Sequence, residues 1–412
     1  MKKNLIVLFI IGLSMTFGVK LGFNYPETGP YSLEGADQLR GAQLAVEEIN
    51  AAGGILGEPA ELLKTDSKSD AKISYRNAMD LVNQGAKMLF GGSSSGVAVS
   101  VGGVAQKQGV PFFGTLTYSN ATTGESGHRF TFRECYNAWM GAKVLANYLK
   151  KNLSGKKYFY ITADYTWGWT TEESIRKFSG TTDKTKNKTY LTPFPKATEV
   201  DYKKALEAAK AENPDVLVFV EFGKDMSTMV KMAYDMGLKS KMQFVVPNLT
   251  LWMAEEATPE AMEGVVGAIC WEWKVPYQYN FPKGKAFVEK FAKKYNTYPS
   301  TSAASAYAIV YEFKRGAEAA KSFDGKAIVK ALEGSSYQYV KDQQTWRDFD
   351  HQSIQTVYAV KGNSPDVVKK DKFKLDYFTI IDKMDGNTAA KTRSEWNEER
   401  TKANQPTELE AL

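Results

Sequence analysis

A run of glycine and serine between an apolar stretch and a helical pattern holds the residue types in this chain that could do chemistry. Residues 92–96 contain three consecutive serines, Ser93, Ser94 and Ser95, and they follow the apolar residues 88–90. Hydroxyl groups and free N–H groups at the beginning of a helix favour an anion or a carbonyl oxygen. Serine is also a preferred helix N-cap. The pattern therefore predicts a binding turn, and simple N-capping is compatible with it.

The same run also matches Gly-x-Ser-x-Gly, the pattern of a hydrolase nucleophile elbow between a strand and a helix. Ser94 would then be the nucleophile, and it would need a histidine from later in the chain. The chain has two histidines, His128 and His351, of which His351 directly follows Asp350. Neighbouring positions do not establish a proton relay, so a serine hydrolase remains the alternative from another functional class.

Aromatic and polar side chains follow several other predicted strands. Ligands of open α/β sheets bind outside the carboxyl ends of the strands, which makes these loops candidate walls of a site. A tryptophan such as Trp167 suggests a ligand wall, and a carboxylate such as Glu221 could hold an ammonium group. The alternatives are interlobe packing for Trp167 and a solvated loop charge for Glu221. The candidates in these loops are Tyr31, Leu116, Thr117, Tyr118, Trp167, Glu221, Phe222 and Asn248, with Trp273 near a predicted crossing between lobes.

Composition argues against several other kinds of site. The 412 residues include only two cysteines and two histidines, which disfavours a zinc centre, a multi-histidine metal site and a disulfide scaffold. No metal and no cofactor is expected. Cys135 and Cys270 fall near two predicted crossings, where either a disulfide or two buried free thiols would fit. The net charge of +6 comes without a basic run, so nucleic acid is not an expected partner.

The first residues are typical of a secretory signal. Lys2 and Lys3 precede an apolar run at residues 5–13, which is too short for a membrane-spanning helix. A buried N-terminal strand is the alternative. We expect residues 1–18 to be a removable signal peptide and the mature protein to be periplasmic.

After this leader, strand and helix patterns alternate, which predicts an α/β fold with parallel sheets. The expected strands cover residues 19–24, 60–65, 88–90, 110–114, 158–162, 190–192, 216–221, 244–246 and 264–273. We interpret the chain as two doubly wound lobes joined by three crossovers, near residues 132–137, 271–276 and 339–346. The polar tail beyond Asp382 is expected to be loosely held.

These crossings divide the chain into two discontinuous domains. The N-terminal lobe is expected to comprise residues 19–135 and 275–342. The C-terminal lobe is expected to comprise residues 136–274 and 343–412.

An ordered set of short motifs resembles the type I periplasmic binding proteins of branched-chain amino acid, amide and urea ABC importers. The motifs are Thr28-Gly29-Pro30-Tyr31-Ser32, Glu48-Ile49-Asn50-Ala51-Ala52-Gly53-Gly54-Ile55, Ser93–Ser95, Asp164-Tyr165-Thr166-Trp167-Gly168, Asn213-Pro214-Asp215 and Asp350-His351-Gln352. Each is weak alone, but their order extends over nearly the whole mature chain.

The resemblance implies a monomeric solute receptor with two lobes that close over a small molecule and deliver it to an ABC permease in the inner membrane. A receptor for a membrane sensor with the same fold is the alternative. In one respect the chain departs from the amino-acid binders, which usually place an acidic residue after the strand that ends here at Val246. This chain has Pro247, Asn248, Leu249 and Thr250 there. An amide, a urea-like solute or an aromatic acid therefore fits as well as an α-amino acid.

Overall fold

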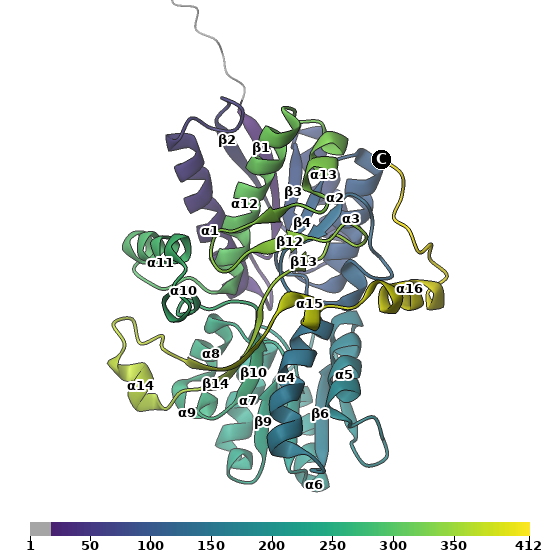
Figure 1. Cartoon of the computed structure of the whole chain (residues 1–412). Coiled ribbons are helices and arrows are strands. Elements are labelled where there is room, and N and C mark those ends of the chain that lie inside the picture. Colours follow the sequence, from purple (N-terminus) through teal and green to yellow (C-terminus); the bar gives the residue numbers. More distant parts are fainter. Residues whose placement is uncertain (1–17) are drawn as a thin grey trace, which may run out of the picture.

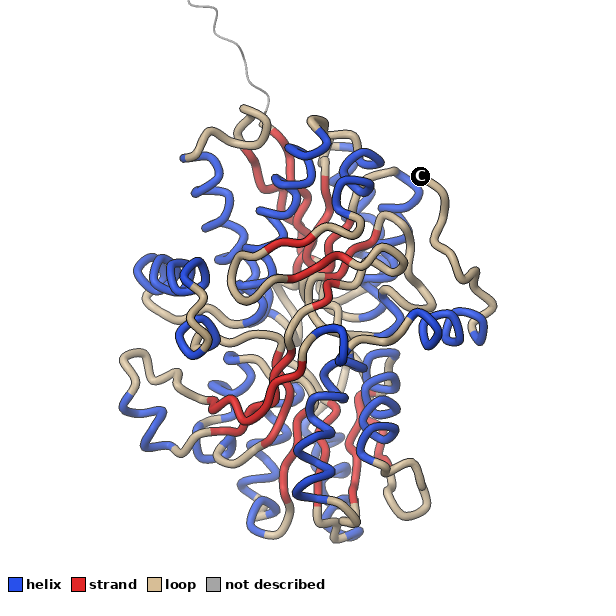
Figure 2. Tube along the Cα trace, viewed as in Figure 1, coloured by secondary structure: helices blue, strands red, loops and turns tan. Residues whose placement is uncertain are grey.

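The computed structural model describes residues 18–412, so all of the expected leader except Gly18 lies outside the described residues. The chain forms two lobes, each built on a central sheet with helices around it (Figures 1 and 2). The prediction of two α/β lobes is confirmed. Among residues 18–412, no helix combines the length and the apolar character that crossing a bilayer requires.

The first lobe contains a five-stranded parallel sheet with the order β2-β1-β3-β4-β5. Its strands are β1 (Val19–Tyr25), β2 (Ala60–Asp66), β3 (Met88–Gly91), β4 (Phe112–Gly114) and β5 (Thr131–Arg133). Its helices are α1 (Ser32–Ala51), α2 (Ala71–Asn83), α3 (Ser95–Gln108), α11 (Pro282–Tyr295), α12 (Thr301–Ala320) and α13 (Gly325–Leu332), with a short 3-10 turn at Asn120–Thr122. The strand order changes direction between β1 and β3, which places a ligand crevice at the carboxyl ends of these strands.

The second lobe repeats this winding and adds two antiparallel strands. Its sheet has the order β15-β14-β10-β9-β8-β6-β7, in which β10 to β7 are parallel and β14 and β15 are antiparallel. The strands are β6 (Tyr158–Ala163), β7 (Thr189–Thr192), β8 (Val216–Val220), β9 (Gln243–Val246), β10 (Val266–Ile269), β14 (Val357–Gly362) and β15 (Phe378–Met384). The helices are α4 (Ala138–Leu153), α5 (Thr166–Ser179), α6 (Glu199–Glu212), α7 (Lys224–Asp235), α8 (Leu251–Ala257), α9 (Pro259–Met262) and α14 (Pro365–Lys370). The order changes direction between β6 and β8, so this lobe has a second crevice at the equivalent place.

The third crossing lies further along the chain than expected. A small antiparallel sheet of β11 (Ser336–Tyr337), β12 (Gln344–Trp346) and β13 (Ser353–Ile354) stays with the first lobe. Trp346 packs edge-on against Phe132 with ring centroids 5.2 Å apart. The crossing therefore comes after residue 354, and the expected boundary at residues 342 and 343 is wrong. Strands of two or three residues are too short to show an alternating pattern.

The C-terminal tail is also placed differently from the prediction. After β15 come α15 (Gly386–Ala389) and α16 (Arg393–Lys402), and α16 lies against the first lobe. Trp396 of α16 is 1% exposed and donates to the Thr123 carbonyl, while Glu410 contacts His128 at 2.6 Å. The tail is neither loosely held nor wholly part of the second lobe. Its polar composition suggested solvation, but its charged side chains bond to the protein.

Candidate functional site

A small cavity lies between the lobes at the ends of strands from both sheets. Its walls are formed after β3, β4, β6 and β8, so both crevices contribute to it. The residues that line it are Ser93, Ser95, Tyr118, Ser119, Tyr165, Trp167 and Phe222. Its volume is about 10 Å³, about the room that one water molecule needs. A solute as large as a benzoate ion would fit only if the rings or the lobes moved apart.

Two helices from opposite lobes begin at this cavity. Ser95 is the first residue of α3, and Trp167 is the second residue of α5. Within residues 18–412, neither N-cap residue, Ser94 or Tyr165, makes a side-chain capping bond, and neither helix has an acidic residue in its first turn. Helix N-termini carry partial positive charge and unpaired N–H groups. The two N-termini together favour an anionic group between the lobes.

Four polar groups on the cavity wall are buried without a partner. The hydroxyls of Ser93, Ser95 and Tyr118 and the indole N–H of Trp167 have no hydrogen-bond partner in the part of the chain that the structure describes. A buried polar group that lacks a partner costs about 1–3 kcal/mol. All four can donate to an acceptor. All four residues line the same cavity, and this clustering of unpartnered donors points to a ligand.

Aromatic rings from both lobes close the site on one side. Tyr31 of the first lobe packs edge-on against Phe222, with ring centroids 5.2 Å apart, and stacks on Phe194 at 5.9 Å. Its hydroxyl lies 3.0 Å from the hydroxyl of Tyr165 in the second lobe. Trp167 also packs edge-on against Phe222 at 5.9 Å. These flat apolar walls suit a flat or branched apolar body.

Buried carboxyl groups surround the site but do not line it. Burial raises the pKa of Glu221 well above its usual range, and Thr192 donates to its carboxylate. Burial also raises the pKa of Asp225 to about 6, against a hydrogen bond from Tyr202 that lowers it. Among the seven lining residues, all within the described chain, none carries a formal charge. The cavity itself is thus neutral and rich in donors.

Five of the predicted site residues line the cavity: Ser93, Ser95, Tyr118, Trp167 and Phe222. Tyr31 covers it from behind Phe222. Ser94 lies beside it, but its hydroxyl turns away and donates to the Ser69 carbonyl at 3.3 Å. Leu116 and Thr117 are buried outside the lining, and the Thr117 carbonyl accepts from Arg133 at 3.2 Å.

Three further candidates do not meet the cavity. The Glu221 side chain lies behind the wall with Thr192. The Asn248 side-chain oxygen accepts from the Tyr136 hydroxyl at 2.6 Å. Trp273 stacks on Tyr298 at 3.9 Å, away from the site. The sequence indicated the loop or crossing for each of them, but not the direction of the side chain.

The lining also includes two residues that the prediction did not select, Ser119 and Tyr165. Each is next to a site residue or a family motif that was recognised: Ser119 follows Tyr118, and Tyr165 lies in the motif that contains Trp167. An aromatic residue directly after β6 was the available signal for Tyr165.

The hydrolase alternative finds no geometric support. His128 contacts Glu410 at 2.6 Å and His351 contacts Glu333 at 3.0 Å, whereas the Ser94 hydroxyl bonds to a backbone carbonyl.

Cys135 and Cys270 are both buried free cysteines, so the disulfide considered from the sequence is absent from the described structure. Burial raises the pKa of the Cys135 thiol to about 12 and that of the Cys270 thiol to about 11.

Comparison with known proteins agrees with this architecture. The family model described as periplasmic binding protein matches residues 18–368. A Leu/Ile/Val-binding protein homolog 7 from Brucella abortus is 26% identical, over 81% of this chain and 86% of the relative.

Solved structures share the fold. A periplasmic binding protein from Burkholderia mallei superposes with a TM-score of 0.82 at 22% identity, covering 92% of this chain and 97% of its own. A solute binding protein of R. palustris in complex with benzoate gives a TM-score of 0.76 at 18% identity, covering 90% and 97%. A branched-chain amino acid transporter substrate binding protein from Streptococcus pneumoniae in complex with isoleucine gives 0.72 at 24% identity, covering 88% and 99%. With a family model that matches most of its length and a two-lobed fold shared with these structures, the chain belongs to the periplasmic binding protein family.

Proposed function

We propose that this chain is the substrate-binding protein of an ABC importer, which captures a small carboxylate-bearing solute between its lobes in the periplasm and delivers it to a permease. The observation that carries the proposal is the set of four unpartnered donors, from Ser93, Ser95, Tyr118 and Trp167, around one interlobe cavity within the described chain. The protein does no chemistry on the solute in this proposal, and it acts as a monomer.

The lining favours a carboxylate with a flat apolar body. The N-termini of α3 and α5 would hold the carboxylate, and the rings of Tyr31, Trp167 and Phe222 would enclose the body. An α-amino acid also needs a partner for its ammonium group. The residues that line the described cavity offer no carboxylate for this purpose. An aromatic acid therefore ranks above an α-amino acid, although solved structures of the same fold hold a ligand of each kind.

Binding would be coupled to closure because each lobe supplies part of the wall. Ser93, Ser95 and Tyr118 belong to the first lobe, and Trp167 and Phe222 belong to the second. A solute that contacts both sets only when the lobes meet shifts the equilibrium towards the closed form. The closed form would then present a joint surface of both lobes to the permease.

The test is a thermal-shift and calorimetry series with benzoate, 3,4-dihydroxybenzoate, L-isoleucine and benzamide. We expect benzoate or its dihydroxy derivative to stabilise the protein increasingly, with the logarithm of concentration above Kd, and neutral benzamide to stabilise it less. Ser95→Ala should weaken binding of the acid by about tenfold or more, because a hydrogen bond to a charged group is lost. Ser94→Ala is the matched control, since the Ser94 hydroxyl faces Ser69. No stabilisation by any of the acids, or equal affinity of Ser95→Ala and wild type, would contradict the proposal.

A further inference from the structure

Residues 117–124, called here the 117–124 loop, supply part of the cavity wall and lie where the two lobes meet. Tyr118 and Ser119 of this loop line the cavity. The loop also reaches the second lobe, because the side-chain amide of Asn120 donates to the Ser174 hydroxyl of α5 at 3.1 Å. Its position therefore determines where two of the lining groups stand.

One side of the 117–124 loop is held by a buried arginine. Arg133 is fully buried and donates to the carbonyls of Thr117 and Ser119 and to the hydroxyl of Thr123, the last at 2.6 Å. Its Nε donates to Gln352 at 2.7 Å, which ties the loop to the chain just before the third crossing. Carbonyl oxygens thus satisfy much of this guanidinium, and they fix the backbone of the loop in return.

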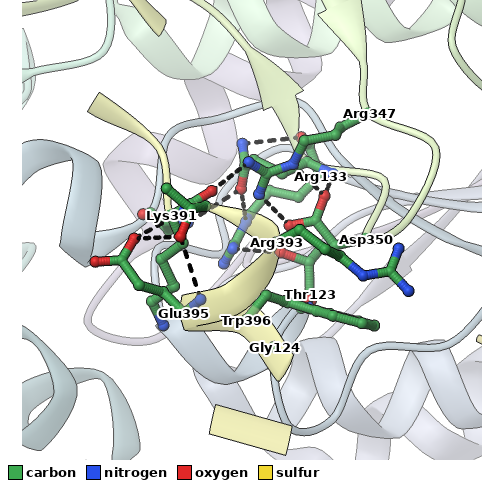
Figure 3. Close-up of polar contacts among 12 residues, drawn as sticks. Thr123, Gly124, Arg133, Arg347, Asp350, Lys391, Arg393, Glu395 and Trp396 are labelled. Atoms are coloured by element: carbon green, nitrogen blue, oxygen red, sulfur yellow. Dashed lines mark hydrogen bonds and ion pairs between the residues drawn. The ribbon is translucent and has the colours of Figure 1, made fainter. Parts of the chain in front are cut away.

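The other side of the loop is held by the C-terminal helix α16. The indole N–H of Trp396 donates to the Thr123 carbonyl at 2.8 Å, and Arg400 donates to the carbonyls of Gly124 at 2.8 Å and Gly127 at 3.1 Å. Figure 3 shows Trp396 beside Thr123 and Gly124, with Arg133 close by. The contact is close, because a Cβ atom on Gly124 would lie 2.8 Å from the Glu399 carboxylate.

The segment that leads into α16 is anchored on both lobes. Lys391, just before α16, pairs with Glu399 at 2.5 Å, and its carbonyl accepts from Arg347 at 2.6 Å. Just upstream, the Thr388 carbonyl of α15 accepts from Lys143 of α4 in the second lobe at 2.6 Å. The family model ends at residue 368, so α15 and α16 lie beyond the part of the chain that it matches.

We propose that Trp396 and Arg400 are positioning residues of the solute site: through the backbone of Thr123 and Gly124 they hold the 117–124 loop so that Tyr118 and Ser119 face the cavity. The inference rests on the proposed function for its effect on binding. Its structural half, that α16 orders the loop, stands on the hydrogen bonds alone. Neither residue touches the cavity, so each acts through the loop.

The first experiment measures amide hydrogen exchange of the full mature chain by mass spectrometry. Trp396→Phe keeps an aromatic ring beside Phe349, removes the donor to Thr123 and also reduces the volume of a buried ring. We expect peptides that cover residues 117–124 to exchange about tenfold faster, because local opening becomes easier when a buried hydrogen bond is lost. Peptides from β3 should be unchanged. Lys402→Ala is the matched control on the same helix, because Lys402 is exposed and pairs with Glu398 of its own helix.

A second pair of variants separates the effect of losing hydrogen-bond donors from the effect of losing side-chain volume. Arg400→Met keeps an apolar stem without donors, and Arg400→Lys restores a charged donor group. We expect faster exchange at 117–124 in Arg400→Met and partial rescue in Arg400→Lys. The second readout is calorimetric affinity for benzoate and L-isoleucine, which should fall about tenfold in Trp396→Phe and Arg400→Met for whichever of the two wild type binds.

The outcomes are distinguishable. Unchanged exchange at 117–124 in Trp396→Phe and Arg400→Met overturns the inference, whatever happens to affinity. Faster exchange with unchanged affinity overturns it as well, since the loop would then be ordered without serving the site. If wild type binds neither solute, it is the proposed function that loses support for these solutes, and the exchange data then decide whether α16 positions the loop.

Discussion

At the scale of one residue, the buried hydroxyl of Tyr118 lowers the stability of the fold while it stays available to a ligand. Tyr118 is 5% exposed and its hydroxyl has no partner within residues 18–412, although the ring packs against Tyr136 and Phe222. A buried hydroxyl without a partner destabilises the folded chain. Under the proposed function, the same group gains a partner when a solute carboxylate enters. The hydroxyl therefore favours binding of the proposed solute but destabilises the folded chain.

This opposition gives a prediction for Tyr118→Phe. We expect the free energy of unfolding to rise by about 1 kcal/mol, because the ring stays and the unpartnered hydroxyl is removed. Affinity for the bound acid should fall by about tenfold in the same variant. Urea denaturation and calorimetry measure the two quantities. A matched control is Tyr158→Phe, which removes a hydroxyl that donates to the Leu153 carbonyl at 3.3 Å, so stability should fall there. Loss of stability in Tyr118→Phe would contradict the interpretation.

Single residues also mark how far the site was predictable. The rule that ligands lie at strand ends selected loops that meet at the interlobe cavity, and residue types selected Ser93, Ser95 and Trp167 within them. The sequence pattern could not predict the direction in which each side chain points. Ser94 and Ser95 are neighbours of the same type, yet the Ser94 hydroxyl bonds to Ser69, whereas Ser95 lines the cavity and its hydroxyl has no partner among the described residues. That choice depends on backbone dihedrals at the helix start, which composition does not record.

At the scale of elements, close helix packing keeps the first lobe together. Helices α1 and α12 run against each other although they are far apart in sequence. Gly41 of α1 lies so near α12 that a Cβ atom there would stand 2.1 Å from the Ala303 carbonyl oxygen. Because α12 follows the second crossing, this contact also fixes the returning chain to the first lobe.

The prediction at this scale compares two helical glycines. Gly41→Ala should destabilise the protein by about 2–3 kcal/mol, because the added methyl group forces α1 and α12 apart. Gly103→Ala in α3 should stabilise it by up to about 1 kcal/mol, since a Cβ atom there would meet none of the described residues within 4 Å and alanine favours a helix. The midpoints of urea unfolding test both. Equal effects of the two substitutions would show that the α1–α12 contact is not tight.

Elements with strong periodic patterns were predictable, and weakly patterned ones were not. The strands β1 to β4 and β6 to β10 lie where apolar runs placed them, within a few residues at each end. The short strand β5 was not predicted, because its residues fall where the first crossover was expected. The small sheet of β11 to β13 and the helix α16 were missed, and both errors moved chain from the first lobe to the second. The helix α16 carries little apolar surface besides Trp396, and its attachment depends on hydrogen bonds to carbonyls that no sequence pattern reveals.

At the scale of the whole molecule, the two lobes meet through a few polar contacts as well as aromatic rings. The Lys224 N–H donates to the Pro30 carbonyl at 3.1 Å, and the Thr250 hydroxyl donates to Glu34 at 2.8 Å. Glu34 lies on α1 of the first lobe, whereas Thr250 caps α8 of the second. Separation of the lobes would break this bond and expose the carboxylate to water. Closure and the protonation of Glu34 are therefore linked.

The direction of this linkage follows from the pKa of Glu34. Burial raises it from 4.5 to about 7, with smaller increases from Asp37 and Glu256 and a decrease from the Thr250 hydrogen bond. The closed form therefore binds a proton more tightly than the open form does. The favourable contribution of protonated Glu34 to closure is complete below pH about 4.5 and is lost as the pH rises through about 7.

We accordingly expect affinity for benzoate to fall by at least about tenfold between pH 5.5 and pH 8, a range in which benzoate stays ionised. Calorimetry of Glu34→Gln should give a nearly flat profile, because glutamine keeps an acceptor for Thr250 and cannot titrate. Asp225, whose pKa burial raises to about 6, bonds to Tyr202 within the second lobe and keeps that partner when the lobes part. Any pH dependence of affinity that remains in Glu34→Gln reports the titration of such groups. A slope in Glu34→Gln equal to that of wild type would show that Glu34 does not couple proton uptake to closure.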